Sequence, residues 1–93
     1  MATEIKAVLE QRGNRYGSFD QHSVITQTFK HWAGEFRKGK PALLPYQQEA
    51  LDMIFHKIGR ILNGDPNYDD SWIDIAGYAQ LVVDKLYEGK KDA

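Results

Sequence analysis

Apolar residues recur every three or four positions in several stretches of the chain, which is the spacing of one face of an α-helix. The strongest pattern begins at Pro45 or Tyr46 and ends at Asn63, where the apolar positions are Leu51, Ile54, Phe55, Ile58, Ile61 and Leu62. A second stripe, between about Asp20 and Lys38, consists of Ile25, Phe29, Trp32 and Phe36. Both stretches are therefore predicted to be amphipathic helices.

Two weaker patterns extend this prediction to both ends of the chain. A short helix is expected from about Ala2 to Gln11, with Gly13 as its stop and a turn-rich loop over 12–19. A longer helix is expected to start between Asp69 and Ser71 and to continue to Gly89, with a frayed tail over 89–93.

Nothing in the sequence alternates in the way that a β-strand requires, and no linker divides the chain. We therefore predict an all-α fold, a compact four-helix bundle-like domain that covers residues 1–93. A chain of this length has a small core. The predicted helix that starts near Asp69 also has a second, semi-apolar face, formed by Asp74, Gly77, Tyr78 and Leu81. Together these features predict a homo-oligomer, a dimer or larger.

Composition narrows the classes of function. The chain has no Cys, which excludes a disulfide framework, a zinc–thiolate site and a cysteine nucleophile. The 12 Lys and Arg nearly balance the 13 Asp and Glu, so there is no strong nucleic-acid signal. No membrane-spanning stretch and no signal peptide is recognisable, and a cytoplasmic location is therefore expected.

Charged residues with possible chemistry concentrate between residues 49 and 74. Glu49 and Asp52 are three positions apart and Asp70 and Asp74 are four apart, so the carboxylates of each pair share a helix face. Carboxylate pairs on facing helices can hold Mg²⁺, whose shell a nucleotide's phosphates could complete. Two cations, Lys57 and Arg60, could then neutralise phosphate charge.

Simpler interpretations compete with a magnesium site. Asp70 lies near a helix start, where a carboxylate is favoured by capping and by the helix dipole alone. Asp74 lies on the semi-apolar face and could be buried in an ion pair with Lys57 or Arg60. Gly59 and Gly77, inside predicted helices, are expected to mark close helix–helix contacts. His22, His31 and His56 form no metal-binding spacing.

The predicted loop over 12–19 offers another candidate site. Arg15 and Tyr16 lie beside Gly17, so that a guanidinium and an aromatic ring could meet a phosphate and a base. An ordered loop with Tyr16 packed on the core explains the same residues equally well.

Three motifs resemble a family of small phage and prophage proteins of uncharacterised function. They are Arg15-Tyr-Gly-x-Phe19, Lys57-x-x-Arg60-x-x-x-Gly64 and Asp70-Ser-Trp-x-Asp74-x-x-Gly77-Tyr78. The resemblance spans about residues 10–84. It implies a phage or prophage origin and a host-cytoplasm location, and it supplies no activity.

The third and fourth predicted helices are more distantly similar to all-α nucleotide pyrophosphohydrolases of the MazG type. That family carries Glu-Glu-x-x-Glu and Glu-x-x-Asp motifs that bind Mg²⁺. Glu49, Asp52 and Asp74 match three of the five carboxylates, whereas Gln48 and Ser71 replace the other two. The resemblance implies a MazG-like helical arrangement, with catalysis weakened or absent.

Two functions follow as expectations. The first is a phage accessory protein that binds a nucleotide-like or phosphate ligand, or a host protein, without turnover. Its ligand site would comprise Lys57, Arg60, Asp74, Arg15 and Tyr16. The alternative is a Mg²⁺-dependent nucleoside triphosphate pyrophosphohydrolase, in which the metal ligands would be Glu49, Asp52, Asp70 and Asp74.

Overall fold

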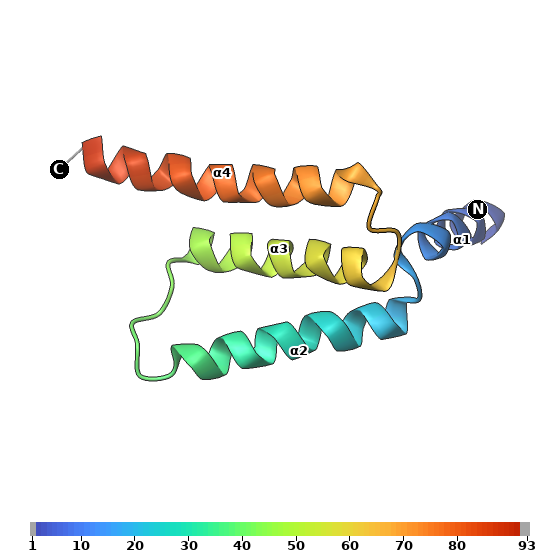
Figure 1. Cartoon of the computed structure of the whole chain (residues 1–93), viewed down its shortest axis with the longest axis horizontal. Coiled ribbons are helices and arrows are strands. Elements are labelled where there is room, and N and C mark those ends of the chain that lie inside the picture. Colours follow the sequence, from blue (N-terminus) through green and yellow to red (C-terminus); the bar gives the residue numbers. More distant parts are fainter. Residues whose placement is uncertain (1, 92–93) are drawn as a thin grey trace.

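The computed structural model of the chain describes residues 2–91, and the side chains of residues 4–90. It contains α1 (Ala2–Tyr16), α2 (Phe19–Arg37), α3 (Pro45–Asn63) and α4 (Asp69–Lys91) (Figure 1). Within residues 2–91 there is no strand, so the predicted all-α, four-helix bundle-like class is confirmed. None of these helices is long and apolar enough to cross a lipid bilayer.

The three longer helices form a single layer with α3 in the middle. Helices α2 and α4 each run antiparallel to α3 on its two sides (Figure 1). Within the described residues no contact joins α2 to α4, and α1 contacts α2 and α3 only. Figure 1 shows α1 projecting from the end of the layer where α2 begins and α3 ends. The layer therefore has two broad faces.

Helix starts follow local signals in the sequence. Ser18 caps α2, because its hydroxyl accepts a hydrogen bond from the Gln21 N–H at 3.2 Å. Pro45 begins α3, where its missing N–H leaves no helical bond unmade. The Leu44 N–H before it donates to the Gln47 side chain at 3.0 Å.

Both chain-terminal helices run further than predicted. Helix α1 continues past Gly13 to Tyr16, and it ends at Gly17, which has a φ of 78° and donates its N–H to the Gly13 carbonyl. The predicted stop and the loop over 12–16 are therefore corrected: Gly13 is tolerated inside a helix, and the left-handed conformation falls on the next glycine. Helix α4 continues to Lys91, so the expected fraying at residues 89–91 is not found, and residues 92 and 93 lie outside the described residues.

Gly59 allows α2 and α3 to approach closely. A Cβ atom built there would lie 2.8 Å from the Thr26 Cγ2 atom and 3.0 Å from the His22 Cε1 atom. The predicted close contact at Gly59 is thus confirmed. The same expectation is wrong for Gly77, where a Cβ would meet nothing within 4 Å.

Candidate anion-binding site

Two arginines and two tyrosines alternate in a stack where α1, α3 and the loop before α4 meet. The Arg60 guanidinium lies 4.3 Å from the centre of the Tyr16 ring, and the Arg15 guanidinium lies 4.2 Å from the centre of the Tyr68 ring. The two rings meet edge to face, with their centres 6.1 Å apart. Each guanidinium thus rests on an aromatic face, which orients it and leaves N–H donors at its edge.

The chain reversal after α3 holds this stack in place. The Asn63 side chain donates hydrogen bonds to the carbonyls of Tyr16 and Ser18, both at 2.9 Å. The Asp65 N–H donates to the Arg15 carbonyl at 2.7 Å. Gly64 lies against the backbone of Arg15 and Tyr16, so closely that no side chain could be accommodated there. Residues far apart in the sequence are therefore fixed next to one another by backbone groups.

Two adjoining hollows open beside the stack. The smaller, about 290 Å³, is lined by Val8, Gln11, Arg12, Arg15, Tyr16, Arg60 and Tyr68. The larger, about 540 Å³, shares Arg12, Tyr16 and Arg60 with it and adds Leu9, Phe19, His22 and His56, with backbone of Gly13, Gly17 and Ser18. Three guanidinium groups and no carboxylate line the smaller hollow, so it favours an anion.

Asp70 contacts the edge of the stack through Tyr68. The Tyr68 hydroxyl donates a hydrogen bond to the Asp70 carboxylate at 2.7 Å. This bond, followed by desolvation and the charge of Asp70, raises the pKa of Tyr68 above its ordinary value, because the phenolate would lose the bond and face a like charge. Tyr68 therefore stays a neutral donor.

A histidine pair closes the far end of the larger hollow. The His22 Nε2 atom lies 3.1 Å from the His56 Nδ1 atom, and the rings meet edge to face. Burial lowers the pKa of His56 to about 4, with the charges of His22 and Arg60 acting in the same direction. Burial and Arg60 also lower the pKa of His22. Both rings are thus neutral near pH 7, and one donates to the other.

Stability is expected to fall as the pH drops from about 6.5 towards 4. An unfolded histidine takes up a proton near pH 6.5, whereas folded His56 resists protonation until about pH 4, so acid favours the unfolded chain across that window. Urea unfolding at a series of pH values measures this. The His56→Gln variant should lose most of the pH dependence, while His31→Gln, which keeps the pair, should retain it. An unchanged slope in His56→Gln would contradict the assignment.

Lys57 and Asp74 lie apart from this stack and form an ion pair between α3 and α4. The Lys57 Nζ atom is 3.0 Å from an Asp74 carboxylate oxygen. The Lys57 side chain is 11% exposed and that of Asp74 is 45% exposed. The predicted pairing of Asp74 with Lys57 is confirmed. Neither residue lines the hollows beside Arg15, Tyr16 and Arg60.

The four predicted magnesium ligands each have a different setting. Asp74 pairs with Lys57, Asp70 accepts from Tyr68, and Asp52 accepts from the Gln48 side chain at 3.0 Å. Glu49 lies exposed on α3. Among the residues whose side chains are described, no three His, Asp or Glu residues gather closely enough to hold a metal ion. These residues do not fit a Mg²⁺ site as placed, and the metal set stays a prediction.

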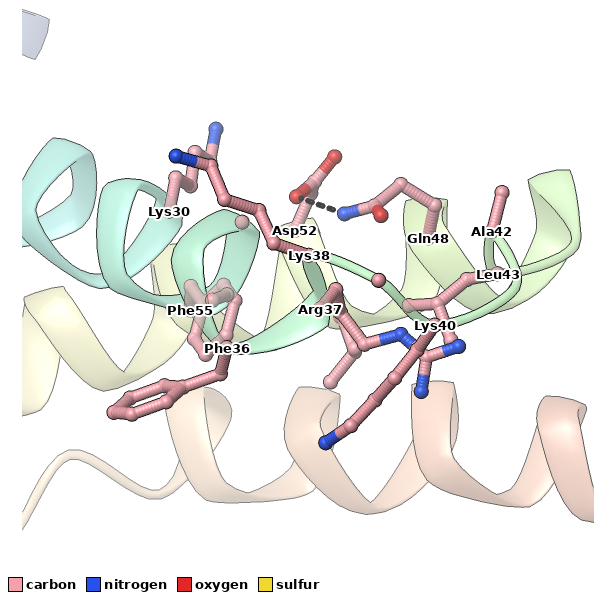
Figure 2. Close-up of a pocket in the computed structure, with 14 residues that line it drawn as sticks. Lys30, Phe36, Arg37, Lys38, Lys40, Ala42, Leu43, Gln48, Asp52 and Phe55 are labelled. Atoms are coloured by element: carbon pink, nitrogen blue, oxygen red, sulfur yellow. Dashed lines mark hydrogen bonds between the residues drawn. The ribbon is translucent and has the colours of Figure 1, made fainter.

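A larger hollow of about 830 Å³ lies between the end of α2 and the start of α3 (Figure 2). Cations border it (Lys30, Arg37, Lys38 and Lys40), and Phe36, Leu51 and Phe55 supply its apolar wall. In Figure 2 these cations spread in different directions, and no two are held together as Arg15 and Arg60 are. The arginine–tyrosine stack is therefore the better ordered of the two basic regions.

Sequence reasoning missed three members of the site. Tyr68 and the pair of His22 and His56 come from separate segments that only the fold brings together. Arg12 could have been found, since it lies three positions before Arg15 and shares its helix face once the first helix is extended.

Comparison with known proteins supplies a family and no activity. A family model described as a domain of unknown function (DUF6378) matches residues 1–85. No curated protein and no solved structure gives a significant match.

Proposed function

The chain belongs to the DUF6378 family, and we propose that it binds a nucleotide-like or phosphate ligand without turnover at the arginine–tyrosine stack. The observation that carries this proposal is the stacking of Arg15 and Arg60 on Tyr68 and Tyr16 around one small hollow. Surface arginines are usually mobile, and here two of them are pre-ordered, which lowers the entropy lost on binding.

The chemistry of the smaller hollow suits phosphate. Guanidinium groups match phosphate oxygens through paired N–H donors, and Arg12 adds a third such group. The Tyr68 hydroxyl is occupied by Asp70, which places a carboxylate at one edge. Phosphate is therefore expected on the side of Arg12 and Arg60, away from Asp70.

The larger hollow suits a base. It is continuous with the smaller one through Arg12, Tyr16 and Arg60, and it adds the apolar side chains of Leu9 and Phe19. Aromatic rings and guanidinium planes are the usual stacking partners of bases. A nucleotide would thus place its phosphates in the smaller hollow and its base in the larger one.

Titration calorimetry with ATP and with inorganic pyrophosphate tests this assignment. Both probes should bind, and Arg15→Gln and Arg60→Gln should each weaken binding by about tenfold or more, as loss of a charge-assisted hydrogen bond does. The matched control is Lys40→Gln, which removes one exposed cation outside the site. Equal weakening by all three substitutions would indicate charge attraction alone and would overturn the proposal.

A phage or prophage origin, a host-cytoplasm location and a counter-defence or host-modulating role rest on the sequence resemblance and are proposed with the ligand site. A pyrophosphohydrolase activity remains the alternative. Pyrophosphate release from ATP in the presence of Mg²⁺, abolished by Asp74→Asn, would favour that enzyme over a binder.

A further inference from the structure

Helix α3 has four distinct sides, which four consecutive residues mark. Lys57 pairs with α4, and Gly59 packs against α2. At about 100° per residue, Ile58 and Arg60 then lie on the two remaining sides, about 160° apart. Ile58 marks one broad face of the layer. Arg60, with the ligand site, marks the other.

The face marked by Ile58 is apolar on all three helices. On α3 it comprises Leu51, Ile54, Phe55, Ile58 and Leu62. Because α2 and α4 run antiparallel to α3, their apolar stripes turn to the same face, with Ile25, Trp32 and Phe36 on α2 and Trp72, Ala76, Ala79, Val83 and Leu86 on α4. We call this set of residues the apolar face. It carries no charged side chain.

Side-chain positions agree with this division. In Figure 2, Lys30 and Phe36 leave α2 on opposite sides. The Phe29 and Phe55 rings meet at 5.8 Å between α2 and α3. Trp32, Phe36, Leu51, Leu62, Trp72, Val83 and Leu86 are all exposed. Among the described side chains, Ala50 is the one hydrophobic residue that is fully buried.

A single layer cannot bury its own apolar face, and stable domains pack two layers together. The chain exposes 7135 Å², whereas a folded monomer of 10.7 kDa exposes about 5,500 Å². Its radius of gyration is 16.2 Å, against about 12 Å for a globular chain of this length. The excess of about 1,600 Å² per chain would let a pair bury up to about 3,200 Å², which lies within the range of obligate homodimers.

We propose that a second copy of this chain covers the apolar face and completes a two-layer core. A face that must be covered for the fold to be stable requires a partner that is always present in equal amount, and a second copy meets that condition. The lack of charge also matches homodimer interfaces, which are more apolar than those of transient complexes. The opposite face, with Arg60 and the ligand site, stays open in such a dimer.

This assignment differs from the surface that the sequence pattern suggested. That surface, around Gly77, Tyr78 and Leu81 on α4, lies on the other side of the helix. Two leucines of nearly equal exposure separate the alternatives: Leu62, 63% exposed on the apolar face, and Leu81, 60% exposed away from it.

Sedimentation equilibrium of the whole chain at tens of micromolar tests the proposal. The wild-type protein and Leu81→Asp should have twice the mass of one chain, while Leu62→Asp should weaken the dimer by about 30-fold or more, as loss of an interface hot spot does. A folded wild-type monomer, with a face open to some other partner, would overturn the proposal, as would dissociation by Leu81→Asp alone.

Dilution of the wild-type protein gives a second test that survives if Leu62→Asp fails to fold. The melting temperature should fall with dilution, because folding and association are coupled. Trp32 and Trp72, both half-exposed in one chain, should emit as buried residues at high concentration and shift to the red on dilution. Melting and emission that do not depend on concentration would contradict the second copy.

Discussion

Gly59→Val is expected to destabilise the protein by about 2–3 kcal/mol. The added Cβ would lie within 3.0 Å of both Thr26 and His22, and valine adds two methyl groups in the same space. The neighbours are not flexible chain ends, because Thr26 and His22 are themselves buried. Helices α2 and α3 would have to separate, which would also break the histidine pair. The melting temperature should drop by about 10–20 °C at fixed protein concentration.

Gly77→Ala is the matched control for this effect. Gly77 also lies inside a helix, but open space surrounds its Cα atom. Alanine there should stabilise the protein by about 0.5–1 kcal/mol through helix propensity alone. If Gly59→Val melts within 2 °C of the wild-type protein, the close approach of α2 and α3 at Gly59 is wrong.

Asp74→Ala is expected to cost about 2–3 kcal/mol of folding stability, because it leaves the Lys57 ammonium nearly buried without its partner. Removing one member of a buried ion pair costs about 3–5 kcal/mol, and the half-exposed Asp74 carboxylate lowers that figure. Chemical denaturation measures the loss. Restoring an apolar pair should rescue it, so that Asp74→Ala combined with Lys57→Met should be more stable than Asp74→Ala.

The same variants decide between a structural and a ligand-binding role for Asp74. If the ion pair joins α3 to α4, the double variant regains stability and still binds ATP as the wild-type protein does. Loss of ATP binding in the rescued variant, or a stability change below about 0.5 kcal/mol in Asp74→Ala, would contradict the structural role.

The helical layer could be predicted because its cause is local. The stripe of Leu51, Ile58 and Leu62 sets the period of α3, and Ser18 and Pro45 set helix starts. The end of α1 could not be placed as well, since Gly13 and Gly17 carry the same signal. Contacts with Asn63 and Gly64, far along the chain, favour the second of them.

The candidate site was predicted in part for the same reason. Arg15, Tyr16 and Arg60 were recognised as single residues with suitable chemistry, and the fold brings these three together. Lys57 and Asp74 carry the same kinds of charge, yet their positions on α3 and α4 direct them to one another. Charge type is visible in a sequence. Which charges meet depends on the packing of helices that are far apart in the chain.

The central claim, a phosphate site at the arginine–tyrosine stack, is tested most directly by NMR of the arginine Nε–Hε groups during titration with inorganic pyrophosphate. The account predicts that the Arg15 and Arg60 signals shift together and saturate with a Kd below about 1 mM, while the Arg37 signal stays in place. Signals of Arg15 and Arg60 that do not move, or that move no more than that of Arg37, would contradict it.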